Sequence, residues 1–445
     1  MASDLRIRFL GGLGEIGRNC MVVEEDSDAF VIDAGLQFAG PEALDAGAER
    51  TIVPDLSALG QIEGRLRGVL VTHGHLDHVG AIPALAEAAG RDGRLPVYGS
   101  YLALAYAALR LNESKMADRV ELRPFKDGAR FSLGHFGVEP VAMTHSIPQA
   151  CGYLVTTRQG LVLHTGDFKL DAHPLDGRRS DLERIGRAAA TEGISLLLAD
   201  STNALVPGRS GEERDVETRL AALMKEHAER RIVVACFASN LHRLGTLTRL
   251  GQHNGRRVAL VGSSMLTAAE LSRLIRVEGG PTGRFVDPWR VDDHGPGEVL
   301  VLATGSQGEA EAALFRMAKG ARRVPRLGPD DVVIFSSSVI PGNEANVERL
   351  IAALGETGAT VLGPNEAAAH VSGHACRDEL VELLSIARPR GFVPVHGTAE
   401  MLEAHAELAE VAGVGGVAVV GDGDGVVLGR NGLAVDLGEL ALTAV

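Results

Sequence analysis

The sequence contains the stretch Val71-Thr72-His73-Gly74-His75-Leu76-Asp77-His78, which places three imidazoles and one carboxylate within six consecutive residues. Residues 68–71 form an apolar run typical of a buried strand, and residues 79–89 have the pattern of an apolar helix. The cluster is therefore expected in a turn between strand and helix. Imidazole and carboxylate groups are ligands of zinc and manganese, and such a turn can direct alternate side chains toward two neighbouring ions. A solvated polar loop is the ordinary alternative, but four ligand-type residues at this spacing favour a dinuclear metal site.

Length and composition indicate a compact enzyme of more than one domain. The 445 residues are many for one core, and 45% hydrophobic residues with 55 glycines fit a globular chain. The cysteines are scattered without a Cys-x-x-Cys pair, which favours a reducing compartment; they are Cys20, Cys151, Cys236 and Cys376. The first residues do not resemble a signal peptide, and no run reaches transmembrane length, so we expect a cytoplasmic protein with no membrane partner.

The net charge of -14 at first argues against a polyanionic partner, because nucleic-acid affinity rests largely on neutralising phosphates. Residues 206–360, however, contain 20 Lys and Arg against 19 Asp and Glu, whereas the remainder contains 24 against 39. The acidity lies almost wholly outside the middle segment. Chance and solvated helix faces are the plain alternative to a functional asymmetry.

The chain begins with strand-like runs. Residues 6–10 alternate like a strand and lead into residues 11–17, Gly-Gly-Leu-Gly-Glu-Ile-Gly, which contain the dinucleotide-binding pattern Gly-x-Gly-x-x-Gly. That pattern must open a helix, whereas residues 19–25 are strand-like, so we expect a glycine-rich hairpin beside the metal site. A third strand ends in Asp33, which we expect to brace the ligand loop.

Further candidate ligands follow later strands. His145 comes after the apolar run at 141–143, Asp167 after the run at 161–163, and His396 after residues 391–395. Alone, such residues are more often core or turn residues than ligands. Together with the first cluster they indicate strand ends that converge on one site, where the Asp167 carboxylate could bridge two cations. His164 is expected to point away.

The middle of the chain follows a different pattern. Residues 214–354 alternate amphipathic helices with apolar strands, which predicts a small parallel sheet inserted as its own domain; the strands are 232–237, 258–262, 299–304 and 332–337. Residues 278–297 are expected to form a loop. The turns after these strands, at 238–240, 304–308 and 336–338, suit phosphate contacts but are also ordinary helix caps. We expect one domain from 1–205 and 361–445, interrupted by 206–360.

Several motifs together resemble a known family. The spacing His-x-His-x-Asp-His resembles the metallo-β-lactamase superfamily, which specifies a fold and a metal site but not a substrate. Over nearly the whole chain, the ordered motifs resemble bacterial ribonuclease J, of the β-CASP branch; they include Gly-Gly-Leu-Gly-Glu-Ile-Gly, Thr-His-Gly-His-Leu-Asp-His, His-Thr-Gly-Asp-Phe-Lys, Asp-Ser-Thr-Asn-Ala, Phe-Ala-Ser-Asn, Thr-Gly-Ser-Gln-Gly-Glu, His-Val-Ser-Gly-His and Pro-Val-His-Gly.

The resemblance implies an α/β fold, an αββα four-layer sandwich with an inserted β-CASP domain containing a parallel sheet. It implies two divalent metal ions, with zinc (Zn2+) as the first expectation and manganese (Mn2+) as the alternative. The activity implied is a ribonuclease of RNA processing and decay, both endonuclease and 5′-to-3′ exonuclease, acting on single-stranded RNA.

The resemblance also assigns roles to individual residues. One ion would be held by His73, His75 and His145, the other by Asp77, His78 and His396, with Asp167 between them. His374 would protonate or stabilise the departing 3′ oxygen, and Asp200 would hold the His374 imidazole in position. Asp77 is expected to be catalytic as well, together with His374 and Asp200.

An exonuclease that starts at a 5′ end needs a pocket for the terminal phosphate. Two turns could build it, namely His370-Val371-Ser372-Gly373-His374 and Gly305-Ser306-Gln307. Phe38 could stack on a base, with a core phenylalanine as the alternative. A pocket sized for one phosphate should favour 5′-monophosphate ends over triphosphate ends.

Three expectations stay open. Ribonuclease J usually carries a further C-terminal domain that helps it dimerise, and this chain stops at Val445, so a homodimer is an open expectation. A small-molecule thioester or lactone hydrolase would use the same ligands but should lack the insert and the His-Val-Ser-Gly-His motif. The remaining alternative is a catalytically weak RNA-binding partner subunit.

Overall fold

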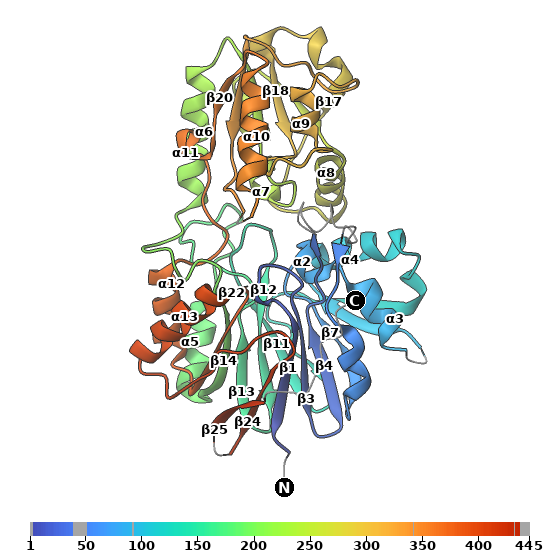
Figure 1. Cartoon of the computed structure of the whole chain (residues 1–445), viewed down its shortest axis with the longest axis vertical. Coiled ribbons are helices and arrows are strands. Elements are labelled where there is room, and N and C mark those ends of the chain that lie inside the picture. Colours follow the sequence, from blue (N-terminus) through green and yellow to red (C-terminus); the bar gives the residue numbers. More distant parts are fainter. Residues whose placement is uncertain (1–2, 39–50, 91–92, 341, 431, 437–445) are drawn as a thin grey trace.

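The chain folds into two lobes, seen in a computed structural model that describes residues 3–38, 51–90, 93–340, 342–430 and 432–436. The lower lobe in Figure 1 contains strands from both ends of the chain, coloured blue to green and red, whereas the upper lobe contains the middle of the chain. The middle segment is therefore inserted into a frame that later strands complete, as the sequence predicts.

Two sheets face each other in the lower lobe. One has eight strands in the order β25 (Gly432–Asp436), β24 (Gly425–Gly429), β1 (Leu5–Gly11), β3 (Cys20–Glu25), β4 (Asp28–Ile32), β7 (Arg65–Leu70), β8 (Leu95–Gly99) and β9 (Val120–Pro124). The other has seven, in the order β10 (Phe131–Leu133), β11 (Phe136–Ala142), β12 (Cys151–Thr157), β13 (Gly160–His164), β14 (Ile194–Asp200), β21 (Gly391–Val395) and β23 (Gly416–Val417). Phe9, Phe30, Phe136 and Tyr153 are fully buried in the core that both sheets share.

Helices cover the outer face of each sheet. On the eight-stranded sheet lie α2 (Leu76–Val79), α3 (Ile82–Ala88) and α4 (Tyr101–Glu113); on the seven-stranded sheet lie α5 (Leu182–Thr191), α12 (Arg377–Ala387) and α13 (Ala399–Val411). Because successive side chains of a strand point to opposite faces, each sheet buries one face in the shared core and the other under its helices. This is the αββα sandwich that the motifs predict.

The upper lobe has three layers. Its six-stranded sheet is wholly parallel, in the order β17 (Phe285–Val286), β16 (Arg257–Val261), β18 (Val299–Ala303), β15 (Arg231–Ala235), β19 (Asp331–Phe335) and β20 (Thr360–Leu362). One face packs on α6 (Glu213–Glu226), α7 (Leu241–His253) and α8 (Ser263–Ile275), the other on α9 (Ala313–Ala318) and α10 (Glu344–Gly355). The predicted parallel insert is confirmed.

Short elements complete the structure. Strands β2 (Leu13–Gly14) and β22 (Gly397–Thr398) pair with each other, as do β5 (Gln37–Phe38) and β6 (Thr51–Ile52). The remaining helices are α11 (Pro364–Ala367) and the 3₁₀ helices η1 (Leu56–Gln61), η2 (Ala117–Arg119), η3 (Pro288–Asp293) and η4 (Pro296–Glu298). Every helix in the described part falls short of the length or apolarity that a membrane span requires.

Two local predictions need correction. The helix expected at 79–89 is present as α3, but it begins later, because the Asp77 carbonyl accepts from the Asn19 backbone and the Ala81 N–H donates to the Ala34 carbonyl. Residues 278–297 are more than a loop, since Phe285 pairs with Val258 in β16 and η3 and η4 follow.

Candidate metal centre

The ends of the frame strands bring the candidate ligands together. His73 and His75 lie between β7 and α2, and Asp77 and His78 lie in the first turn of that helix. Gly74 is required at this turn because a Cβ there would lie 2.7 Å from a Tyr106 ring carbon. The later ligands follow the ends of strands of the facing sheet: His145 follows β11, Asp167 follows β13 and His396 follows β21. His396 has a φ of 54°, an uncommon conformation for a residue other than glycine, and such strain concentrates at functional sites.

The seven residues form two groups that share one carboxylate. His73, His75, His145 and Asp167 make the first, and Asp77, His78, Asp167 and His396 make the second. Within each group, one ligand atom from every residue lies within 4.8 Å of all the others. This is the grouping that the resemblance implies.

In the first group, the ring nitrogens of the three histidines face one another. His75 Nδ1 lies 3.0 Å from His73 Nε2 and 3.2 Å from His145 Nε2. His145 donates through Nδ1 to the Gly373 carbonyl at 2.7 Å, so its Nε2 lone pair faces inward. Burial lowers the pKa of His75 to about 4 and that of His145 to about 3. The rings are neutral at pH 7, which is the form that binds zinc.

Asp167 connects the two groups. Its carboxylate lies 3.3 Å from His78 Nε2, 3.0 Å from His396 Nδ1 and 3.7 Å from His73 Nε2. Burial opposes ionisation, but the charges of His396 and His78 outweigh it and hold the pKa of Asp167 well below its usual value. The buried Nε2 of His396 has no hydrogen-bond partner among the described residues. A buried carboxylate between two sets of nitrogens, with an orphaned imidazole atom beside it, fits two divalent cations.

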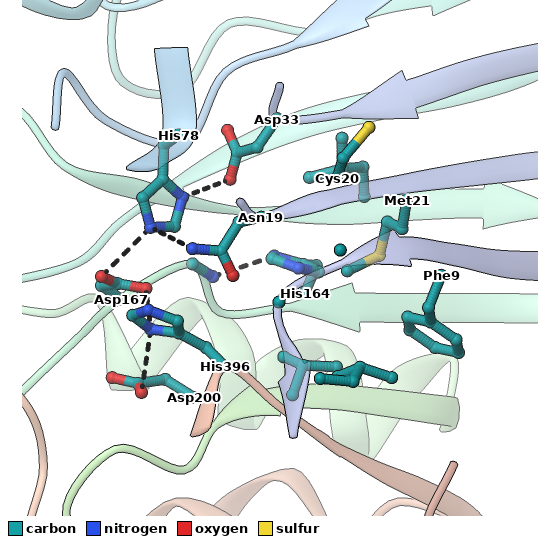
Figure 2. Close-up of a pocket in the computed structure, with 16 residues that line it drawn as sticks. Phe9, Asn19, Cys20, Met21, Asp33, His78, His164, Asp167, Asp200 and His396 are labelled. Carbon is teal, nitrogen blue, oxygen red and sulfur yellow. Dashed lines mark hydrogen bonds and ion pairs between the residues drawn. The ribbon is translucent and has the colours of Figure 1, made fainter. Parts of the chain in front are cut away.

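A layer of polar side chains holds the ligands in place. Asp33 accepts from the Thr72 backbone at 2.8 Å and from His78 Nδ1 at 2.7 Å, which confirms its predicted role as a brace (Figure 2). Asn19 donates to the Asp77 carbonyl, and its amide nitrogen lies 3.1 Å from His78 Nε2. Such outer contacts fix the orientation of metal ligands.

His374 and Asp200 are paired beside the second group. The Nδ1 atom of His374 donates to Asp200 Oδ2 at 2.8 Å, which leaves Nε2 as the ring atom for other chemistry. Burial opposes protonation, but the Asp200 charge and this hydrogen bond raise the pKa of His374. Thr202 donates to the other Asp200 oxygen at 2.7 Å, so the carboxylate is fixed.

Comparison with known proteins identifies the family. Models for the metallo-β-lactamase superfamily, the ribonuclease J β-CASP domain and the Zn-dependent metallo-hydrolase RNA specificity domain match residues 13–216, 229–354 and 365–419. A ribonuclease J from Mycobacterium tuberculosis is 38% identical over 98% of this chain and 75% of its own length. The chain belongs to the ribonuclease J family.

Two further relatives are also named ribonuclease J. Ribonuclease J from Corynebacterium glutamicum is 38% identical, and that from Helicobacter pylori strain J99 is 35% identical. The chain spans 58% and 61% of their respective lengths. A solved protein of unknown function from Enterococcus faecalis V583 has a TM-score of 0.65 at 17% identity, covering 96% of this chain and 100% of its own, so it shares the fold.

The loop His370–His374 contacts the candidate metal centre through hydrogen bonds. The Gly373 carbonyl binds His145, and a Cβ on Gly373 would lie 2.8 Å from that of Ser146, so only glycine fits. Ser372 Oγ accepts from the His374 backbone at 3.1 Å. His370 is half-buried, and its buried Nδ1 atom lacks a partner in the described part of the chain. Val371 packs on the core of the upper lobe.

The other predicted substrate residues have no hydrogen bond to the ligand groups among the contacts of the described residues. Ser306 and Gln307 are buried, and the Gln307 amide donates to the Ser338 carbonyl and accepts from the Ile340 backbone, both at 2.8 Å. No hydrogen bond or ion pair recorded within the described ranges joins Gly305, Ser306 or Gln307 to the ligand groups. Phe38 is 58% exposed, so its alternative placement in the core is wrong.

The sequence predicts no role for Asn203, and it places Ser239 only in a turn suited to phosphate contacts or helix capping. Asn203 donates to Ser372 Oγ at 2.8 Å and to the His374 carbonyl at 3.0 Å, and Ser239 reaches His75. Both lie in family motifs, Asp-Ser-Thr-Asn and Phe-Ala-Ser-Asn, which was the available signal. His164, expected to point away, lies outside both ligand groups and accepts from the Gly166 backbone at 2.9 Å.

Proposed function

We propose that the chain is a metal-dependent ribonuclease that hydrolyses phosphodiester bonds of single-stranded RNA in RNA processing and decay. The observation that carries the proposal is the carboxylate of Asp167, shared by two groups of buried ligand atoms, with the His374–Asp200 pair beside them. A phosphodiester resists hydrolysis because it is anionic. When bound, two divalent ions activate water at neutral pH and offset the phosphoryl charge.

The chain would hold zinc, or manganese in its place, through seven residues. The ligands would be His73, His75 and His145 for one ion, Asp77, His78 and His396 for the other, and Asp167 for both. The neutral imidazoles of the first group supply lone pairs, and the carboxylates of the second supply negative charge. Asp33, Asn19 and Gly373 keep these side chains in place through the hydrogen bonds described above.

His374 would serve as general acid. Asp200 fixes its ring through Nδ1, so that Nε2 can deliver a proton to the departing 3′ oxygen of the RNA. The Asp200 charge and its hydrogen bond raise the pKa of His374 against the effect of burial, which favours the protonated ring that a general acid requires.

Domain limits and location belong to the same proposal. Residues 1–205 and 361–445 would form the metallo-β-lactamase domain and residues 206–360 the β-CASP domain. The four cysteines are all buried and unpaired, which supports a reducing compartment, the cytoplasm.

Hydrolysis of a labelled single-stranded RNA tests the activity. The purified chain with zinc or manganese should cleave the RNA and should leave thioester and lactone substrates intact. Turnover of either small molecule without RNA cleavage would instead support the small-molecule hydrolase, and ion binding without any turnover would support a partner subunit.

The direction of cleavage needs a separate assay. We propose 5′-to-3′ exonuclease activity that favours a 5′ monophosphate, together with endonuclease activity, with Ser306 and Ser372 near the phosphate and Phe38 against a base. RNA with a 5′ monophosphate should be degraded faster than triphosphorylated RNA, and Ser306→Ala should reduce this ratio while sparing internal cleavage. Ser264→Ala, an exposed serine of the same lobe, is the matched control. Equal rates on both ends in the wild type would reject the phosphate pocket and leave the metal centre standing.

A further inference from the structure

One hydrogen bond links a candidate metal ligand to the inserted lobe. The Nε2 atom of His75 lies 3.1 Å from Ser239 Oγ, although the two residues are 164 positions apart in the sequence. Ser239 lies in the loop between β15 and α7 of the upper lobe, whereas His75 precedes α2 of the lower lobe. The other ring nitrogen of His75, Nδ1, faces His73 and His145. One side of the ring therefore faces the ligand group and the other faces the inserted lobe.

The two ring nitrogens of a ligand histidine have opposite requirements. A neutral imidazole carries one N–H, so a ring that offers Nδ1 to a cation must carry its proton on Nε2. That N–H needs an acceptor, and the Ser239 hydroxyl oxygen is at the correct distance. A serine at this position therefore selects the tautomer of His75 that has its lone pair on the metal side.

Three of the other four ligand imidazoles also have one ring nitrogen held by an outer partner. His78 donates through Nδ1 to Asp33 at 2.7 Å, His145 through Nδ1 to the Gly373 carbonyl at 2.7 Å, and His73 Nδ1 lies 3.1 Å from Thr72 Oγ1. Those three partners belong to the frame. Among the residues that the structure describes, His75 alone of these four has its outward nitrogen held by the inserted lobe.

We propose that Ser239 is a positioning residue through which the inserted lobe fixes the ring and tautomer of His75 and so strengthens binding of one divalent ion. The inference rests on the metal centre of the proposed function. The inference adds that the metal affinity of that centre depends on the position of the upper lobe relative to the lower lobe.

The upper lobe holds this loop firmly. Asn240, next to Ser239, caps α7 by accepting from the Arg243 backbone at 2.9 Å. Arg243 is only 1% exposed, and it donates to both oxygens of the Glu213 carboxylate at 2.8 to 2.9 Å. The same guanidinium donates to the Ala369 carbonyl at 3.2 Å, on the segment that returns to the frame. A buried, charge-assisted network of this kind is rigid, so Ser239 is presented to His75 at a fixed position.

Apolar packing also joins the lobes at this point. Leu102 of α4 and Ile147 belong to the lower lobe, yet both are buried in the core cluster that includes Leu241 and Leu244 of α7. The start of α7 is thus anchored to the frame by side chains as well as by hydrogen bonds. The distance between Ser239 and His75 is therefore set by the contact between the lobes.

Metal affinity without RNA tests the proposal. Metal-free wild type, Ser239→Ala and Ser239→Thr would be titrated with zinc in competition with a chromophoric chelator. Loss of an outer-shell partner typically weakens metal binding by about 10–100-fold, so Ser239→Ala should lose that much affinity for one of two ions. Ser239→Thr keeps the hydroxyl and should retain the wild-type isotherm.

A second serine provides the control. Ser337 Oγ is buried without a hydrogen-bond partner in the described part of the upper lobe, so Ser337→Ala should bind zinc like the wild type. Equal affinity in Ser239→Ala and the wild type would overturn the role of Ser239 and leave the metal centre intact, as would equal losses in Ser239→Ala and Ser337→Ala. A wild type that binds no zinc would overturn both. Circular dichroism of the metal-free variants reports folding independently.

Discussion

The loops that follow the parallel strands differ in chemistry between the two lobes. In the lower lobe, the loops after β7, β13 and β21 carry histidine and aspartate whose ligand atoms face one another. In the upper lobe, the loops after β15 and β18 carry serine, asparagine and glutamine, and Asn240 and Gln307 use their amides to hold the backbone. Both lobes end strands in polar turns, but Asn240 and Gln307 of the upper lobe bond to nearby backbone, whereas the ligand atoms of the lower lobe face one another.

This difference suggests that the lower lobe supplies the reactive groups and that the upper lobe holds them in position. Buried polar atoms are normally paired, so a group that is left unpaired in a well-formed site indicates a missing partner such as an ion or a substrate. The lower lobe contains that group. The upper lobe contains a network that fixes positions, and it reaches the metal centre through Ser239 and through the segment that leads to His374.

The largest expected effect comes from removing a lower-lobe ligand. His75→Ala or Asp77→Ala should abolish RNA hydrolysis and lower the number of bound ions, because each removes a donor from a preformed group. The protein should remain folded by circular dichroism, since the core consists of other residues. Asp118→Ala, an exposed aspartate, is the matched control. Wild-type turnover in either ligand variant would remove the metal hypothesis.

A smaller loss is expected for His374→Ala. A general acid contributes roughly 10²–10⁴-fold to the rate, so cleavage should slow by that factor. The number of bound ions should stay near normal, because His374 is held by Asp200 and is not among the seven residues of the two ligand groups. If the variant instead loses an ion, His374 is a ligand, an arrangement that its closeness to Asp167 and His396 also permits.

Phe38→Ala should affect binding rather than chemistry. Stacking of a base on an aromatic ring contributes about 1–3 kcal/mol, so the KM for single-stranded RNA should rise while kcat stays nearly unchanged. Trp289→Ala removes an exposed aromatic side chain of the upper lobe and serves as the comparison. An unchanged KM for Phe38→Ala would show that this exposed ring does not contact RNA.

The smallest expected effect is a shift along the pH axis. The Asp200 charge raises the pKa of His374 against the effect of burial, and the protonated form is the active general acid. Activity should therefore fall as pH rises through that pKa. Asp200→Asn removes the charge, lowers the pKa and moves this alkaline limb to lower pH. A pH profile of kcat measures the limb, with bound metal quantified in parallel, and an unmoved limb would contradict the assigned pair.

Much of the site could be predicted from sequence because its chemistry is concentrated at strand ends. His145, Asp167 and His396 each follow an apolar run, and the ends of such strands meet at one edge of the frame. The roles of Asn203 and Ser239 could not be predicted, because serine and asparagine after a strand are ordinary caps and their partners lie 169 and 164 residues away. The break between α2 and α3 depends on Asn19 and Ala34, which contact the helix only in the folded chain.

Stepwise metal loading of the wild type tests whether RNA hydrolysis depends on two bound divalent ions. The chain would be stripped with a chelator, then titrated with zinc or manganese while bound ions and RNA hydrolysis are measured together. We expect no hydrolysis in the metal-free protein, two ions per chain at saturation, and activity that returns as the second site fills. Undiminished RNA hydrolysis by the metal-free protein would contradict this dependence.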